Sequence, residues 1–339
     1  MTWVIPARSF SCAVVLRTAL ASANKNLLGQ LRKATGYSIS HCKKALELHD
    51  NDIDEASKWL AAQAQAEGWA KATKLAGRVA RQGQLGLSIN KDNTQAAILE
   101  LNCETDFVAR NQLFVELVTD LTETCLATSS AVPQSNTSGA GIYKELWNME
   151  QVREIKHADG KTLADKVALS IGLLGENMLL SRAMKMHSVG SDIQLYGYTH
   201  PPHSSNRTAG AQGTATFLGK YGAVVAVRSV ADKPADAEVL KHLCLQVIGM
   251  NPECIGTAED LEKYPEFAEQ QKAEEGEAAA APAQEDDAPV LKNKTSKDKF
   301  LLKQDWLNDE DYTVEQVLQE AGLEVLEFVR MEVGQCSNS

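Results

Sequence analysis

The chain has 339 residues, which is enough for two or more domains with their own hydrophobic cores. Its hydrophobic fraction of 44% is typical of a globular protein, and no run of about 18 apolar residues predicts a membrane span. The formal net charge of −11 argues against general binding to nucleic-acid backbones, so we expect no direct nucleic-acid partner and no membrane partner.

The first 22 residues have the composition of a targeting segment. No Asp or Glu occurs before Glu47, whereas Arg8 and Arg17 stand among Ser, Thr, Ala and apolar residues. An arginine-containing, serine-rich and acid-free start is typical of an organelle transit peptide. A secretory signal is the alternative because 12–16 is a short apolar run, but Arg17 interrupts this run early. We therefore expect residues 1–22 to be a mitochondrial transit peptide and the protein to work in the matrix.

Residues 23–69 form a predicted three-helix module. Thr35-Gly36 ends the first helix, Ser40 caps the second, and Asn51-Asp52 separates the second from the third. Such a short module buries little apolar surface, and modules of this kind usually recognise a partner.

An alanine-rich segment with four basic residues follows this module. If the segment is helical, the four share one face: Lys71, Lys74, Arg78 and Arg81. Two interpretations remain open. The segment is either a solvated connector helix or a docking stripe for an acidic partner surface.

Residues 70–160 are predicted to contain a hairpin and a helix. Leu85, Leu87 and Ile89 alternate with polar or small residues, Lys91-Asp92-Asn93 supplies a turn, and 97–103 alternates again. A long helix is expected to open at the Asp-Phe pair of residues 106 and 107. Its predicted buried face is Leu113, Phe114, Leu117, Val118 and Leu121.

Residues 161–265 repeat this pattern of strands and helices. The predicted helices are 161–170 and 235–249, and the predicted strands are 178–187, 193–198 and 223–230. Because hairpin and helix occur twice, we expect an α+β fold with two related core subdomains, 70–160 and 161–265.

Two segments interrupt or follow the second predicted subdomain. Residues 201–219 are a Pro/Ser/Gly/Thr-rich insertion, and 266–298 are predicted to be a flexible charged linker. Residues 299–339 then return to the core, with a helix capped by Thr313 and a strand at 325–333.

The sequence carries little that predicts chemistry. Seven cysteines are scattered without paired spacing, so we expect small core residues, not a zinc site or a disulfide framework. His200-Pro-Pro-His203 lacks a third metal ligand, and Gly160-Lys161-Thr162 lacks the earlier glycine of a phosphate loop. We therefore expect no metal, no cofactor and no bond-making reaction, which favours a binding role.

The most informative stretch is 105–111, which places a carboxylate beside an aromatic ring at a predicted helix start. Such a pair can act on another protein, because the acid competes for cations or amides and the ring enters an apolar slot. Two structural interpretations compete with this one. Asp106 can be an N-cap, and Phe107 can be a core residue on the same helix face as Phe114.

Several segments together resemble the elongation factor Ts family, specifically its mitochondrial form. The resemblance is most specific at 102–111, and it covers roughly 24–260 and 305–335. The segments that carry it are Leu31-Arg32-Lys33-Ala34-Thr35-Gly36, Cys42-Lys43-Lys44-Ala45-Leu46, Asn102-Cys103-Glu104-Thr105-Asp106-Phe107-Val108-Ala109-Arg110-Asn111, Gly175-Glu176-Asn177, Tyr198-Thr199-His200, Thr313-Val314-Glu315-Gln316-Val317-Leu318 and Phe328-Val329-Arg330-Met331-Glu332-Val333-Gly334.

The resemblance implies guanine nucleotide exchange on mitochondrial elongation factor Tu, the GTPase that delivers aminoacyl-tRNA to the ribosome. Asp106 and Phe107 match the family residues that disturb the magnesium and phosphate region, with Thr105 and Val108 framing them. His200 matches a contact residue of the second half. The three-helix module resembles a ubiquitin-associated-like domain that binds the nucleotide domain of the GTPase. Its matching contact residues are Arg32, Thr35, Gly36, Cys42, Lys43 and Lys44.

This sequence departs from the family in two regions. Bacterial members carry a helical coiled-coil excursion where 266–298 is a proline-broken charged stretch, and the insertion 201–219 directly follows His200. The competing functional hypothesis is a mitochondrial adaptor that binds a helical or GTPase partner without exchanging nucleotide. A measurement of GDP release from the cognate GTPase separates the two hypotheses.

Overall fold

The computed structural model describes residues 23–35, 37–128, 141–190, 192–203, 214–230, 236–257, 260 and 296–335. The predicted transit peptide 1–22 and most of the predicted linker 266–298 lie outside these residues. The chain divides into two compact units, one up to Glu67 and the other from Gly68 onwards. Within the described ranges, no helix is both long enough and apolar enough to cross a membrane.

Helices α1 (Lys25–Thr35), α2 (Ile39–Leu48) and the first part of α3 (Ile53–Leu75) form the first unit. The buried residues of its small core are Leu31, Cys42, Ala45, Leu46, Ala56 and Leu60. The prediction of three helices is confirmed, but the predicted cap of the second helix is wrong. Ser38, not Ser40, caps α2, because its hydroxyl accepts a hydrogen bond from the His41 amide at 3.3 Å.

Helix α3 is longer than predicted, because its 23 residues continue through the alanine-rich segment. It ends at Leu75, so Arg78 and Arg81 lie beyond it, and the predicted helical face of four basic residues is wrong. Lys71 instead donates to the Gly172 carbonyl of helix α7 (Leu163–Leu174) at 3.3 Å. The Arg78 guanidinium lies 3.5 Å from the Glu104 carboxylate.

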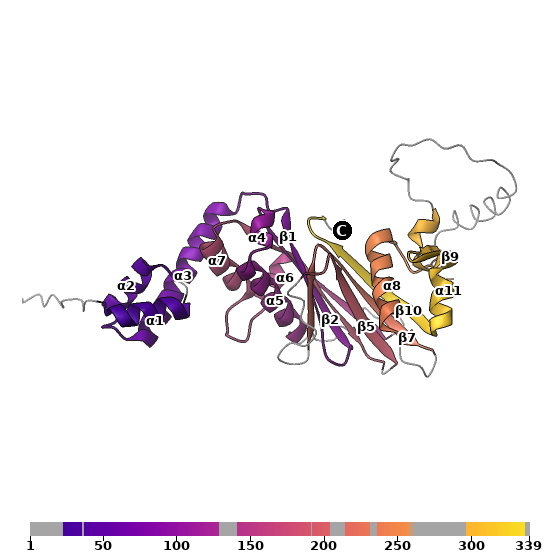
Figure 1. Ribbon diagram of the computed structural model, residues 1–339, viewed down its shortest axis with the longest axis horizontal. Coiled ribbons are helices and arrows are strands. Elements are labelled where there is room, and N and C mark those ends of the chain that lie inside the picture. Colours follow the sequence, from indigo (N-terminus) through magenta and orange to yellow (C-terminus); the bar gives the residue numbers. More distant parts are fainter. Residues whose placement is uncertain are drawn as a thin grey trace, which may run out of the picture. The chain divides into compact units, whose positions relative to one another are not determined.

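Two antiparallel sheets lie face to face in the second unit, with helices on both outer sides (Figure 1). The first sheet has the strand order β3-β4-β2-β1-β6 and the second has the order β10-β7-β5. The strands of the first sheet are β1 (Gln82–Ile89), β2 (Gln95–Cys103), β3 (Ile142–Trp147), β4 (Met178–Ser188) and β6 (Ala215–Gly219). The strands of the second sheet are β5 (Ile193–His200), β7 (Tyr221–Ser229) and β10 (Leu323–Glu332).

Helices cover the outer face of each sheet. The first sheet is covered by α5 (Gln112–Ala127), α6 (Met149–Glu154) and α7 (Leu163–Leu174). The second sheet is covered by α8 (Ala237–Met250) and α11 (Val314–Ala321). The remaining short elements are α4 (Asp106–Ala109), the 3-10 helices η1 (Ser296–Lys299) and η2 (Leu301–Lys303), and the strand pair β8 (Asp305–Trp306) and β9 (Asp309–Thr313).

The predicted hairpin is confirmed, and β1 pairs with β2 along its whole length. Both faces of β1 are buried, because helix α5 lies on one side of it and the second sheet on the other. The polar residues of the alternating pattern are therefore also buried and hydrogen-bonded. Gln84 donates to the Ala109 carbonyl, and the Ser88 hydroxyl lies 3.0 Å from that of Thr216.

The two sheets do not correspond to the two predicted subdomains, 70–160 and 161–265. Strand β4 pairs with β2 and β3, and β6 pairs with β1, although both strands come after residue 160. Residues 215–219 of the predicted insertion form β6, whereas 204–213 lie outside the described part. In the C-terminal segment, Thr313 caps α11 as predicted, and the predicted strand is β10.

The cysteines behave as core residues where the structure describes them. Cys42, Cys103, Cys125 and Cys244 are buried, and Cys254 is half-buried. Burial raises the pKa of both Cys103 and Cys125 to about 12, which keeps these thiols protonated.

Candidate partner-binding site

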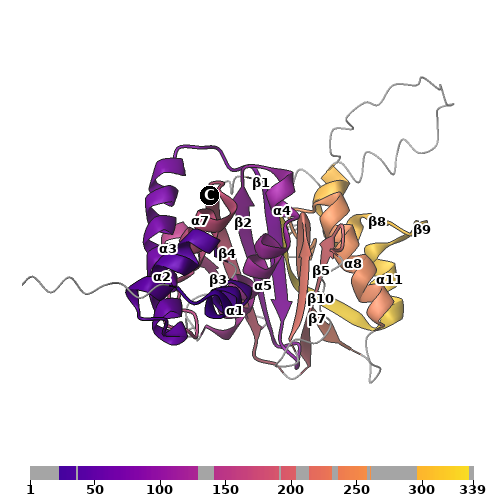
Figure 2. The same ribbon diagram turned by 60° about the vertical axis from the view of Figure 1, so that its left-hand side comes forward.

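Helix α4 is a single turn that follows β2 and lies beside β1 (Figure 2). Thr105 is its N-cap residue, and the Thr105 hydroxyl accepts a hydrogen bond from the Val108 amide at 3.4 Å. Asn111 separately caps α5 by accepting from the Leu113 amide at 2.9 Å. The predicted continuous helix is therefore two helices, because the Asn111 side chain starts a second one.

The break between α4 and α5 decides where Phe107 lies. In one continuous helix, Phe107 would share a face with Phe114, seven residues later. Phe114 is fully buried, whereas 84% of Phe107 is exposed. Ala109 forms the buried side of α4, together with part of Val108. The core-packing interpretation of Phe107 is therefore wrong, and the ring faces solvent. Leu113 is also exposed, against the prediction for the face of α5.

The Asp106 carboxylate is also available to a partner. The N-cap interpretation is wrong, because Thr105 occupies that position. Asp106 instead forms an ion pair with Arg110, with 2.9 Å between Oδ2 and Nη2; the Arg110 side chain is largely exposed and that of Asp106 is partly exposed. A solvent-accessible pair of this kind contributes little to stability, so Asp106 can exchange Arg110 for another cation at small cost. The sequence analysis did not identify Arg110 as the ion-pair partner of Asp106.

The underside of α4 is attached to the first sheet. Gln84 of β1 donates a side-chain hydrogen bond to the Ala109 carbonyl at the end of the turn. At the start of the turn, the Cys103 thiol donates to the Thr105 carbonyl at 3.2 Å. The exposed ring and carboxylate are thus carried by a short helix that is fixed at both ends.

His200 is exposed at the end of β5, and backbone contacts place it at the same end of the second unit as α4. The Lys220 amide donates to the His200 carbonyl at 3.0 Å. The Lys220 ammonium donates to the Gly83 carbonyl at 2.7 Å, and the next residue, Gln84, contacts α4. Lys220 therefore connects His200 to the Gly83–Gln84 end of β1, which also holds α4.

The predicted contact residues of the first unit differ in their exposure. Arg32, Lys43 and Lys44 are exposed, and the Lys44 ammonium lies 5.5 Å from the centre of the Trp59 ring. Thr35 is half-buried, and its hydroxyl donates to the Leu31 carbonyl. Gly36 lies outside the described residues.

The prediction that Cys42 contacts a partner is wrong. Cys42 is fully buried in the core between the helices, so it has no surface for direct contact.

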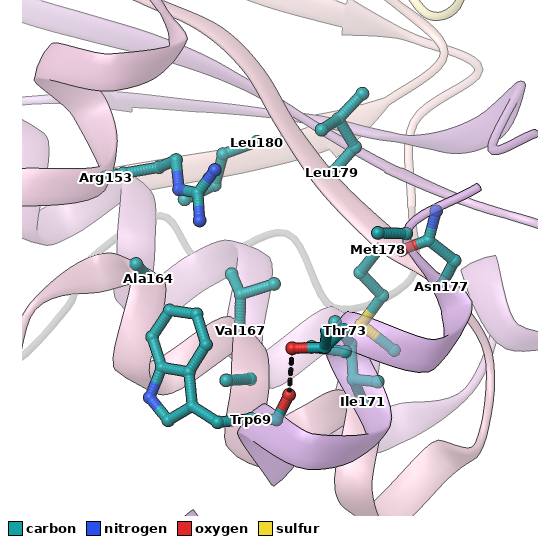
Figure 3. A pocket seen from close by; sticks show the side chains of 13 residues that line it. Trp69, Thr73, Arg153, Ala164, Val167, Ile171, Asn177, Met178, Leu179 and Leu180 are labelled. Carbon is teal, nitrogen blue, oxygen red and sulfur yellow. Dashed lines mark hydrogen bonds between the residues drawn. The ribbon is translucent and has the colours of Figure 1, made fainter. Parts of the chain in front are cut away.

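A cavity of about 300 Å³ lies between α3, α7 and the start of β4 (Figure 3). Trp69 forms one wall. Its indole Nε1–H donates to Asp165, which is not among the lining residues, at 2.9 Å. Arg153 is the one charged side chain among the thirteen residues that line the cavity. This lining offers no paired acid and base, so the cavity does not suggest catalysis.

Metal-binding geometry is absent from the part of the chain that the structure describes. No group of three or more His, Cys, Asp or Glu side chains is arranged there to hold an ion. The candidate site consists of the exposed ring and partly exposed carboxylate on α4 and the exposed basic side chains on the first unit.

Comparisons with known proteins agree with these features. A family model described as "Elongation factor TS" matches residues 104–335, and one described as "Elongation factor Ts, mitochondrial, N-terminal" matches residues 12–70. The protein named "Elongation factor Ts, mitochondrial" from Branchiostoma floridae is 38% identical over 324 residues, covering 94% of this chain and 92% of the relative. The protein of the same name from Aedes aegypti is 37% identical over 316 residues, covering 93% of this chain and 90% of the relative. The chain therefore belongs to the elongation factor Ts family, and within it to the mitochondrial type.

Proposed function

We propose that this chain releases GDP from mitochondrial elongation factor Tu by inserting the Phe107 ring and the Asp106 carboxylate beside the bound magnesium and phosphates. Thr105 and Val108 frame the two acting side chains. The observation that carries the proposal is the exposure of Phe107, which is 84% exposed although its helix is fixed at both ends. A large ring held exposed on a fixed turn is available to enter an apolar slot of a partner.

As a member of this family, the protein is a nucleotide exchange factor of translation elongation in the mitochondrial matrix, and it makes and breaks no covalent bond. Magnesium holds GDP through phosphate oxygens in a nearly octahedral shell. Displacing one ligand, or turning the phosphate-binding loop, weakens the binding of both the ion and the nucleotide. Linkage then makes the effect reciprocal, because incoming nucleotide expels the factor by the same coupling free energy.

The ring cannot supply the whole effect. An acceleration of GDP release by about 10³-fold corresponds to lowering the barrier by roughly 4 kcal/mol. Burial of a Phe side chain supplies about 1.5–3 kcal/mol. We propose that the other contacts hold the complex while nucleotide leaves, with Arg32, Lys43 and Lys44 acting on the first unit and His200 on the second.

The Asp106→Ala, Phe107→Ala double variant tests the proposal. Release of fluorescent GDP from the cognate GTPase is measured beside the affinity of the factor for the nucleotide-free GTPase. We expect release to slow far more than binding weakens, because the two side chains act while nucleotide leaves and the other contacts remain.

Three outcomes of this experiment would contradict the proposal. Unchanged release would remove the role of the pair. Equal losses in release and affinity would reassign the pair to docking. Tight binding without any acceleration by the unsubstituted protein would favour the adaptor hypothesis.

A further inference from the structure

Glu176 lies in the turn between α7 and β4, and its carboxylate contacts the base of α4 from 71 residues away in the sequence. Its Oε2 accepts a hydrogen bond from the Thr105 amide at 3.0 Å, and its Oε1 accepts from the Thr105 hydroxyl at 2.6 Å. Gly175 ends α7 in the left-handed conformation at φ 84°, which turns the chain just before Glu176. One carboxylate therefore holds both donors of the N-cap residue.

The residues next to Thr105 and Glu176 form a further contact between the same two segments. The Asn177 amide donates to the Glu104 carboxylate at 2.7 Å. Residues 104–105 and 176–177 are thus joined by three hydrogen bonds, each of which uses a carboxylate as acceptor. Hydrogen bonds to ionised groups are shorter and stronger than neutral ones, so this junction is the firmest attachment of α4.

The contact also orients the turn that carries Phe107. The Thr105 hydroxyl donates to Glu176, so its free lone pairs face the Val108 amide, which donates to it at 3.4 Å. Two-point attachment of Thr105 fixes the rotation of the helical turn, and Phe107 is only two residues away. A functional side chain has to be held within about 0.5 Å and 10–20° of its working position, so a loosened cap affects the ring.

We propose that Glu176 is a positioning residue for nucleotide exchange, which acts by fixing the α4 turn so that Phe107 and Asp106 enter the GTPase in register. This inference rests on the proposed function of Phe107. Glu176 acts through Thr105, so it needs no contact of its own with the GTPase.

Glu176→Gln is the test variant, because it keeps the size of the side chain. In glutamine, an NH2 group replaces one of the two carboxylate oxygens. A hydrogen-bond donor then faces either the amide or the hydroxyl of Thr105, which are donors themselves. We expect release of fluorescent GDP at saturating factor to slow about tenfold, as the loss of one charge-assisted hydrogen bond implies. The affinity for the nucleotide-free GTPase should change less than about twofold, because the other contacts are kept.

Asp165→Asn is the matched control. At the start of α7, Asp165 Oδ2 accepts from the Thr162 amide at 3.1 Å and from its hydroxyl at 3.0 Å, so a carboxylate again holds both donors of an N-cap residue, while Oδ1 accepts from Trp69. Asp165→Asn and Glu176→Gln should lower the midpoint of thermal unfolding to a similar extent. Only Glu176→Gln should slow exchange.

Combination with Phe107→Ala separates failure of this inference from failure of the proposed function. In the Phe107→Ala background, Glu176→Gln should cause a smaller further loss than in the unsubstituted protein, because only Asp106 remains to be positioned. If Phe107→Ala alone leaves release unchanged, the proposed function fails. If Phe107→Ala slows release but Glu176→Gln does not, or if Glu176→Gln has its full effect in both backgrounds, the positioning role is overturned.

Discussion

Replacement of Phe107 by alanine isolates the contribution of the exposed ring to exchange. The ring is 84% exposed in the free chain, so nearly all of the free energy of burying it is available to the complex. That free energy is about 2 kcal/mol for a Phe side chain. If the ring enters its slot only as GDP leaves, its loss raises the barrier by the same amount and slows release roughly 30-fold.

The assay is single-turnover release of fluorescent GDP from elongation factor Tu at saturating factor. Phe107→Leu should retain most of the rate, because leucine keeps much of the apolar volume. Leu146→Ala is the matched control, because Leu146 is also 65% exposed but lies on β3, three strands away from β1 in the sheet order. The midpoint of thermal unfolding should stay the same in all three variants, because neither side chain packs in the core.

Two results would refute this reasoning. A release rate of Phe107→Ala within about twofold of the unsubstituted protein would show that the ring contributes no such free energy to the transition state. A clear fall in its unfolding midpoint would show that the ring packs against the protein in solution, contrary to its exposure in the structure.

Two further predictions concern stability. Gly68→Ala should lower the free energy of unfolding by about 1–3 kcal/mol, because the new Cβ would lie 2.4 Å from the Ala168 carbonyl oxygen; urea unfolding measures this, and an unchanged midpoint would contradict it. Burial acts to raise the pKa of Asp159, but a backbone amide, His157 and Lys166 outweigh it and lower the pKa to about 2. The contribution of Asp159 to stability is therefore complete above its ordinary pKa and is lost as the pH falls towards 2. Asp159→Asn should flatten the acid side of the stability profile between about pH 4 and 2, and an unchanged profile would contradict this.

Local pattern predicted most of the elements but not how they assemble. Alternation located β1 and β2, and Thr313 located the start of α11, because these signals depend on neighbouring residues. The membership of β4 and β6 in the first sheet depends on pairing between distant segments, which alternation does not encode.

Within the candidate site, the sequence located the α4 segment but not its geometry. The helical spacing of Phe107 and Phe114 predicted one buried face, and this failed because Asn111 starts a new helix between them. Cys42 shows the converse error, since a residue matched to the family's partner-binding region is buried. The hydrogen bonds of Glu176 to Thr105 link residues 71 positions apart, so no local pattern indicates them.

The strand order of the first sheet has a consequence for biogenesis. Strand β1 is flanked by β2, which follows it closely in sequence, and by β6, which begins only at Ala215. A chain still emerging through a narrow channel would therefore carry an unpaired β1 edge until more than a hundred further residues had appeared. The sheet is completed only after β6 has emerged, so its folding depends on long-range strand pairing, which is slow. Until then, the exposed edge of β1 has to be protected from pairing with other chains.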